Sequence, residues 1–418
     1  MKTRLVLAFS LVMGLLSCNR EDIVPVSGIL LSSKSVNIKV GESILLTVAI
    51  DPLNASDSRL SWLSRNENIA AVDASGNING VAFGNTFILV TALDGNITDS
   101  CEVFVNGTLN GPAGDEILTM GNGYANDVYY SMANGVVATV PRTNWDIAFM
   151  TGSRTSTIII NAGAGIKLYT YPDGDLSAWS VVNPAGISTW KPMNNSDTTW
   201  SLGAFERNAL GHPDYGWGIY NSVSHDVVGD SIFIIQLKDQ SLRKLSVTKK
   251  VSVGNEYIFR FAGIDGSNQV IDTVDCKPYT GKNFIYYSFD EQNVIDREPL
   301  TDSWDFMITK YIEMIPDGSG GKVPYPVIGV LTNSGIRSAT IDNVDVTTTD
   351  YSSASFVSSV SEIGSDWKSF NMTLNQWTLK SNSVYFVRDR NMKVYKVVFT
   401  GFGGSGTGRI EFKKTNLN

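Results

Sequence analysis

The chain contains few of the residues that most metal and redox sites require. It has three cysteines and two histidines in 418 residues. No Cys-x-x-Cys pair is present, which argues against structural zinc and iron–sulfur sites. Basic residues are in the minority, with 33 Lys and Arg against 41 Asp and Glu, so the formal charge is −8. An acidic chain without a basic stripe is not expected to bind nucleic acid.

Runs of Leu, Glu and Lys at helical spacing are also missing. Val, Ile, Thr, Tyr and Gly are plentiful instead, which favours short strands separated by turns. The hydrophobic content of 43% is typical of a globular chain, and the length is enough for about two or three domains. We therefore expect an all-β protein.

An apolar run over residues 5–16 follows two basic residues near the N-terminus. It is too short to span a bilayer, and the pattern predicts a signal peptide over residues 1–17. The run ends before Cys18 in a segment that resembles the lipobox of bacterial lipoproteins, where the cysteine is lipidated and anchors the chain in a membrane. An ordinary cleavage site followed by a chance cysteine is the alternative. The acidic pair Glu21-Asp22 resembles surface-export signals of Bacteroidetes lipoproteins, which implies an outer-membrane lipoprotein exposed on the cell surface.

Residues 18–26 form a short tether, and residues 27–105 alternate strands with turns. Several of their segments resemble the bacterial Ig-like domain of group 2: Gly41-Glu42, Trp62-Leu-Ser64, Ser75-Gly76, Val81-Ala-Phe-Gly84 and Cys101-Glu-Val. The resemblance implies a β-sandwich that acts as a spacer or an adhesive module. We expect Trp62 to be the buried tryptophan of that sandwich.

Residues 106–115 have the composition of a linker, and an internal duplication follows them. Tyr129-Tyr130-Ser131 recurs 157 residues later, and a Trp-Asp strand at Trp145 recurs 159 residues later. A second tryptophan segment, at Trp217, recurs 150 residues later. The order of the segments is the same in both copies, which predicts a first repeat over 116–283 and a second over 284–418, each antiparallel β.

The duplicated region resembles the HmuY family. The segments that carry the resemblance are Trp145–Phe149, Trp304–Tyr311, Ile328–Asn333, Ile363–Lys368 and Tyr385–Val387. The family consists of Bacteroidetes surface lipoproteins with a mostly β fold, and its best-known members bind haem and pass it to an outer-membrane receptor. The resemblance implies haem as the ligand, with its iron held between two His or two Met side chains.

Methionine is the expected iron ligand, because the chain has only two histidines. Strand alternation from Trp145 places Met150 on the opposite face, and the equivalent alternation from Trp304 places Met307 there too. Met193 lies in a loop from which a second thioether can approach. Each methionine is more often core filler than a ligand.

His212 is the alternative ligand. It lies in a loop on one side of Trp217, and His225 lies in a loop on the other side, 13 residues along the chain. Surface histidines without a ligand are the simpler interpretation of both.

No enzyme is expected. The glycine-rich segment 401–406 is followed by a strand and not by a helix, so it lacks the basis of a dinucleotide site. The repeated Asp146 and Asp305 are interpreted as caps for nearby backbone N–H groups. A disulfide between Cys101 and Cys276 stays open, since sequence alone cannot show whether they approach each other.

A second function remains possible on the same residues, namely a surface adhesin or a glycan- or protein-binding module without haem. Trp179, Trp190 and Trp200 cluster in the loops of the first repeat. Their rings are suited to stacking on a sugar or on a porphyrin, and equally to packing in a core.

Overall fold

The protein consists mainly of β-strands in the computed structural model, which describes residues 23–81, 84–106 and 115–417. Within these residues, α1 (Gly404–Thr407) is four residues long and the other helical segments are short 3-10 turns. The all-β prediction is confirmed. No helix of the described chain is long and apolar enough to cross a membrane. Cys18 and the predicted signal peptide lie outside the described residues, as does most of the linker 106–115.

The chain divides into two compact units. The smaller unit holds most of residues 23–103, and its short strands form three small sheets in the orders β2-β9-β8-β5, β3-β7-β6 and β1-β4. The strand bounds are β1 Gly28–Leu31, β2 Ser35–Lys39, β3 Ser43–Leu45, β4 Val48–Asp51, β5 Leu60–Ser64, β6 Ala70–Val72, β7 Asn77–Gly80, β8 Gly84–Ala92 and β9 Thr98–Asn106.

Alternating burial builds the core of the smaller unit. In β2, Val36 and Ile38 are buried while their neighbours are not, because successive side chains of a strand point to opposite faces. Trp62 is half-buried and packs on Gly76, where an added Cβ would lie 2.5 Å from the indole ring. Gly76 also has a φ of 83°, so glycine is required there for two reasons. Trp62 is thus less buried than we expected.

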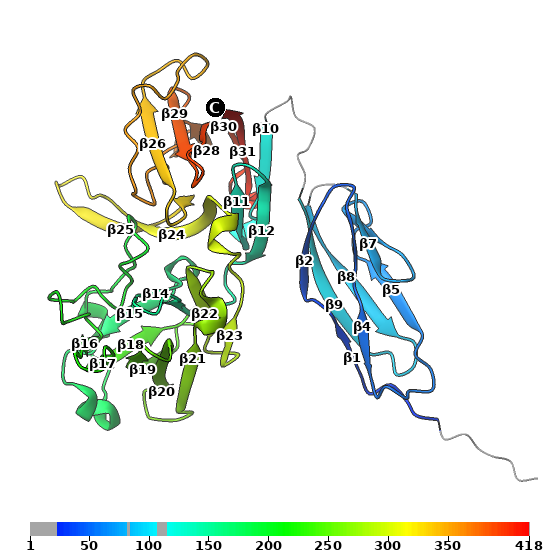
Figure 1. Ribbon diagram of the computed structural model, residues 1–418, viewed down its shortest axis with the longest axis horizontal. Coiled ribbons are helices and arrows are strands. Elements are labelled where there is room, and N and C mark those ends of the chain that lie inside the picture. The colour runs from blue at the N-terminus through cyan, green and yellow to red at the C-terminus, as the bar shows by residue number, and fades with distance from the viewer. Residues whose placement is uncertain (1–22, 82–83, 107–114, 418) are drawn as a thin grey trace, which may run out of the picture. The chain divides into compact units, whose positions relative to one another are not determined.

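The larger unit spans residues 115–417. Its strands are β10 Asp115–Thr119, β11 Asn126–Ser131, β12 Gly135–Pro141, β13 Ile147–Met150, β14 Ile158–Ile160, β15 Lys167–Thr170, β16 Gly218–Tyr220, β17 Val227–Gly229, β18 Phe233–Gln236, β19 Leu242–Val251, β20 Glu256–Gly263, β21 Val270–Asp275, β22 Phe284–Ser288, β23 Asn293–Ile295, β24 Phe306–Pro316, β25 Lys322–Thr332, β26 Arg337–Asp342, β27 Lys368–Asn371, β28 Gln376–Leu379, β29 Ser383–Arg388, β30 Val394–Phe402 and β31 Arg409–Asn416. The 3-10 turns are η1 Asn122–Tyr124, η2 Ala162–Ala164, η3 Leu176–Val181, η4 Ile187–Thr189, η5 Lys277–Tyr279 and η6 Thr301–Ser303. Figure 1 shows these strands in two groups, with the yellow β24–β25 hairpin between them.

The two groups have the same topology. One contains the order β15-β18-β19-β20-β21, with β17 paired to β19 and β16 paired to β17, and the other contains β26-β29-β30-β31-β10. All of these neighbours are antiparallel. The register also agrees, because Phe233 pairs with Leu245 as Tyr385 pairs with Val397, each 152 residues later. The repeated sequence segments therefore form corresponding strands.

The two groups exchange their hairpins. β13 and β14 of the first copy form a sheet with β22 and β23 of the second, while β24 and β25 of the second copy pair with β11 and β12 of the first. Tyr286 faces Ala148 in one sheet, and Tyr129 faces Met307 at the matching position of the other. Each of these two four-stranded sheets thus contains strands from both sequence repeats. The exact domain boundaries stay a prediction.

The recurring aspartates hold this exchange in place. The Phe289 N–H donates to Asp146 at 2.8 Å, and the Met132 N–H donates to Asp305 at 2.6 Å. Each carboxylate therefore satisfies the backbone just after a Tyr-Tyr-Ser strand of the other copy. Burial raises the pKa of both carboxyls, and these backbone N–H groups oppose the rise.

The prediction that Met150 and Met307 lie on the strand face opposite Trp145 and Trp304 was wrong. β13 begins at Ile147, and the chain bends at Asp146, so strand alternation does not extend back to Trp145. Trp145 packs with Ala148 and Met150 and not with Ile147. Trp304 likewise packs with Met307. Met150 and Met307 therefore share a face with the tryptophans that precede them.

Candidate functional site

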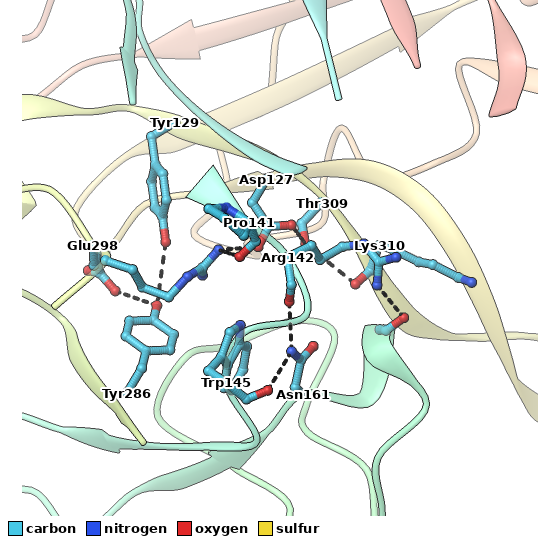
Figure 2. A network of polar contacts seen from close by, with 12 residues as sticks. Asp127, Tyr129, Pro141, Arg142, Trp145, Asn161, Tyr286, Glu298, Thr309 and Lys310 are labelled. Carbon is cyan, nitrogen blue, oxygen red and sulfur yellow. Dashed lines mark hydrogen bonds and ion pairs between the residues drawn. The ribbon is translucent and has the colours of Figure 1, made fainter. Parts of the chain in front are cut away.

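A polar network lies buried where β11, β22 and β24 meet (Figure 2). The Arg297 guanidinium donates to the Asp127 carboxylate at 2.8 Å, and the Tyr286 hydroxyl donates to Glu298 at 2.7 Å. Burial raises the pKa of Glu298 to about 7. The adjoining hollow has a volume of about 70 Å³, which suits a few water molecules. This network holds the two copies together and leaves no space for a porphyrin.

The expected iron ligands lie in four different hollows. Met307 lines the small hollow at the network. Met150 lines a polar cleft of about 1000 Å³, and Met193 lines a groove of about 850 Å³. His212 lines a fourth hollow. Met150 and Met193 therefore do not face a common ligand, and the pair expected from sequence is not brought together.

Met193 is also poorly placed to bind iron. Its side chain is 5% exposed and belongs to the hydrophobic core. The Thr170 hydroxyl donates a hydrogen bond to its sulfur, with the two atoms 3.3 Å apart. This thioether forms part of the floor of its groove.

Both histidines of the chain line one hollow of about 590 Å³, together with Tyr215 and Tyr220, and we call it the His–Tyr hollow. His225 Nδ1 lies 2.6 Å from the Tyr220 hydroxyl. The ring centroids of His212 and Tyr220 are 5.1 Å apart. Both imidazoles are exposed, as expected for loop residues, but the fold gathers them around one phenol.

The β16–β17 hairpin positions these rings. Trp217 is fully buried just before β16, and its indole N–H donates to the Ser156 carbonyl at 3.1 Å. In the turn, the Asn221 side chain accepts the Val223 N–H at 2.9 Å. The chain then passes through His225 with a φ of 62°. This left-handed conformation is uncommon for residues other than glycine, although Asn, Asp and His adopt it most readily.

The second copy provides an internal comparison. In its β27–β28 hairpin, Asn371 caps the same turn by accepting the Thr373 N–H at 3.0 Å. The left-handed residue there is Asn375, with a φ of 49°. Phe370 occupies the position of Tyr220, since each lies 3 residues after the buried tryptophan. The hairpin therefore forms without an imidazole or a phenol at these two positions.

The charge of the His–Tyr hollow is positive. Arg154 and Lys250 line it, and none of its described lining residues is Asp or Glu. The Lys250 ammonium is buried, donates to Asn255 at 2.6 Å and lies 4.0 Å from the centre of the Tyr257 ring. Burial lowers the pKa of Lys250 to about 8. The amine is still mostly protonated at neutral pH, so the hollow attracts anionic groups.

Cys101 and Cys276 are both free and buried, and they belong to different units. The disulfide left open by the sequence stays a prediction. Burial raises the pKa of the Cys101 thiol to about 12 and that of the Cys276 thiol to about 11. Both are therefore unreactive thiols of the core.

Both histidines were expected from the sequence as candidates, but Tyr220 was not. A signal was available, because the two tryptophan hairpins align with an offset of 150 residues. That alignment places Tyr220 opposite Phe370 and His225 opposite Asn375. In the described residues, no group of three His, Cys, Asp or Glu side chains is arranged to hold a metal ion.

Residues 25–103 match the family model of the bacterial Ig-like domain (group 2), so the chain contains such a domain at its N-terminal side. The match covers less than half of the chain. An Ig-like virion protein of Serratia phage KSP90 is 36% identical over 85 residues, which is 20% of this chain and 33% of the phage protein. The chain thus spans about a third of that relative.

Two solved structures overlap parts of the chain. Domains 4 and 5 of the S-layer protein SbsC align at 22% identity with a TM-score of 0.17, over 19% of this chain and 51% of that one. A putative HmuY_like heme binding protein from Bacteroides vulgatus ATCC 8482 aligns at 17% identity with a TM-score of 0.18, over 37% of this chain and 82% of that one.

Proposed function

We propose that this protein is a non-catalytic surface protein whose larger unit binds haem in the His–Tyr hollow. One observation carries the proposal: the two histidines of the chain line a single hollow with Tyr220. The equivalent hairpin of the second copy has Asn375 and Phe370 at the positions of His225 and Tyr220, so these groups are not needed to form the hairpin. Their presence in the first copy is explained by a ligand.

The number of potential ligands in the His–Tyr hollow suits haem better than a bare metal ion. A bare transition-metal ion in a structural site takes about four protein ligands, whereas the porphyrin supplies four nitrogens and leaves only the axial positions of the iron to the protein. Imidazole and phenolate are both known axial ligands. Two histidines and a tyrosine are therefore sufficient for haem.

His225 is the proposed principal ligand. Its Nδ1 is held by the Tyr220 hydroxyl. In the tautomer whose Nδ1–H donates to the phenol oxygen, the lone pair of Nε2 is free to bind iron, and the hydrogen bond fixes the ring. His212, whose ring centroid lies 5.1 Å from that of Tyr220, supplies a second imidazole.

The hollow also suits the carboxylates of haem. Arg154 is exposed at the hollow, and Lys250 contributes a buried ammonium with one hydrogen-bonded acceptor among the described residues. Tyr215 and Val253 add apolar surface for the porphyrin edge.

The Ig-like domain is proposed to act as a spacer between the ligand-binding unit and a membrane. Lipid at Cys18 would anchor the chain, and the resemblance to HmuY lipoproteins implies the outer face of the outer membrane. It also implies transfer of haem to an outer-membrane receptor. No catalytic step is proposed.

Haem titration of the purified chain, followed by its Soret band, tests the proposal. We expect His225→Asn and Tyr220→Phe to weaken binding at least about tenfold, which corresponds to about 1.4 kcal/mol. Both variants copy residues that the second hairpin already accommodates, so loss of folding is not the expected cause. His212→Ala should alter the spectrum of the complex.

Met150→Ala and Met193→Ala serve as controls and should leave the titration unchanged. Loss of binding in the methionine variants alone would overturn the assignment of ligands in favour of thioether ligation. A wild-type chain that shows no Soret shift, under oxidising or reducing conditions, would overturn haem binding itself.

A further inference from the structure

A second hollow, which we call the Trp190 groove, shares no lining residue with the His–Tyr hollow and has a volume of about 850 Å³. Trp190 is half-buried and lies along it, with its ring packed edge-on against Tyr171 at a centroid distance of 6.0 Å. Unlike Trp179 and Trp200, whose indole N–H groups donate to Gln269 and to Thr332, Trp190 makes no indole hydrogen bond within the described chain. One part of the ring packs on the core cluster around Tyr171, and the part that stays exposed lines the groove together with the unpartnered N–H.

Both walls of the groove are additions to the repeated fold. One wall belongs to the connection 171–217 between β15 and β16, whereas the equivalent connection between β26 and β27 is the much shorter 343–367. The other wall belongs to the β24–β25 hairpin, whose strands have 11 residues each, whereas the equivalent β13 and β14 have 4 and 3. The repeated fold forms without either extension, so the groove is not required for folding.

The walls are fixed to each other. The Met314 N–H of the hairpin donates to the Asp197 carboxylate of the connection at 3.0 Å. Arg207 is held by the Asn194 carbonyl at 2.6 Å and the Asn195 carbonyl at 3.1 Å. These bonds arrange the lining residues before any ligand arrives, which lowers the entropy cost of binding.

The groove is cationic in an acidic protein. Lys191, Lys322 and Arg207 line it, and none of its described lining residues is Asp or Glu. The two lysines are exposed and have no ion-pair partner among the described residues. Because the chain as a whole carries a formal charge of −8, this local excess of positive charge favours an anionic ligand.

We infer that the Trp190 groove binds an acidic glycan. The flat indole face is suited to stacking on the apolar face of a sugar ring, and the two lysines are suited to its carboxylate or sulfate groups. The Asn194 amide is suited to hydrogen bonds with sugar hydroxyls, and Asn208, whose Nδ2 donates to the Thr170 hydroxyl at 2.9 Å, offers its carbonyl oxygen as an acceptor. A protein partner would need roughly 800 Å² of matching surface on each side, and one ring flanked by separate cations offers less than that.

The inference is tested by isothermal titration of the purified full chain with polygalacturonate, and with neutral dextran as the reference polymer. We expect binding to polygalacturonate only, weakened in roughly 0.5 M NaCl because the charges are screened. Trp190→Ala should weaken binding about tenfold, and a Lys191→Glu/Lys322→Glu variant should abolish it. Lys393→Glu changes an exposed lysine elsewhere and should bind like the wild type.

Three results would overturn the inference: no binding to polygalacturonate, equal binding to dextran, or an equal loss of binding in Lys393→Glu. Thermal melting of each variant separates loss of the groove from loss of the fold. Haem titration of Trp190→Ala should match that of the wild type, so the glycan and haem proposals stand or fall separately.

Discussion

The hydroxyl groups of Tyr129 and Tyr286 lie 3.5 Å apart in the buried centre of the larger unit. They are corresponding residues of the two copies. The Tyr129 ring packs edge-on against Trp304 at 4.9 Å, and the Tyr286 ring packs in the same way against Trp145 at 4.8 Å. The point where the copies exchange strands is therefore also the point where their tyrosines meet.

The two tyrosines differ in what their hydroxyls support. Tyr286 donates to the buried Glu298 carboxyl, whereas the Tyr129 hydroxyl has, among the described residues, only the long contact with Tyr286. We expect Tyr286→Phe to lower the free energy of unfolding by about 1–3 kcal/mol, because it leaves a buried acceptor without its donor. Tyr129→Phe should cost clearly less. Urea unfolding of both variants measures the difference, and an equal loss would contradict it.

Trp145 and Trp304, which lie just before β13 and β24, should be major stabilising residues. Trp304 is 1% exposed and Trp145 is 8% exposed. Replacement of either by Ala should lower the free energy of unfolding by about 3–5 kcal/mol, because a large cavity is left in the core. Trp377→Ala is the control, since this ring is 39% exposed. A loss at Trp377 as large as that at Trp304 would speak against the core role.

Glu206 should make stability fall as the pH rises. It is buried, accepts the N–H groups of Ile158 and Gly203, and burial raises its pKa from 4.5 to about 8. A raised folded-state pKa contributes stability below the unfolded value of 4.5, and this is lost as the pH rises through about 8. Each unit of displacement is worth about 1.4 kcal/mol.

The Glu206→Gln variant isolates this contribution. The amide does not titrate, so the fall in unfolding free energy between about pH 5 and pH 8 should be smaller than in the wild type. Part of the slope should remain, because burial also raises the pKa of Glu298 to about 7. Chemical unfolding at several pH values provides the measurement, and an unchanged slope would show that Glu206 stays ionised in the fold.

Lys368 should have the opposite dependence. Its ammonium donates to the Ile328 carbonyl at 2.5 Å and lies 4.3 Å from the centre of the Trp367 ring. Burial lowers its pKa from 10.5 to about 7. Because its pKa is lowered, Lys368 contributes stability above pH 10.5 that is lost as the pH falls through about 7. The free energy of unfolding of Lys368→Met should therefore exceed that of the wild type by the largest amount near pH 6. Melting curves would disprove this if Lys368→Met and the exposed Lys393→Met behaved alike.

Cys18→Ala should release the protein from membranes. The lipobox resemblance implies a lipid on this cysteine, and the apolar leader before it is proposed to be removed on export. We expect the variant to lack lipid by mass spectrometry and to appear in the soluble fraction. A variant that fractionates with membranes like the wild type would contradict the anchor.

The sequence by itself determined the class of fold and the repeated elements. Short segments such as Tyr129-Tyr130-Ser131 and the strand after Trp145 carry their own periodicity, and the two copies can be aligned without knowing what they contact. The role of Asp146 and Asp305 as backbone caps was also predictable, because a short acidic side chain at the start of a strand commonly accepts hydrogen bonds from nearby backbone N–H groups.

Only the tertiary structure decided which strands pair and which candidates meet. Nothing local in β13 distinguishes β22 from β11 as its partner, because both carry a Tyr-Tyr-Ser segment. The bend at Asp146 turned Trp145 to the face of Met150, and long connections carried Met150 and Met193 to separate hollows. His212 and His225 meet at Tyr220 because buried Trp217 anchors the hairpin between them. Such an approach depends on packing across the whole unit. Neighbouring residues in the sequence therefore give no signal of it.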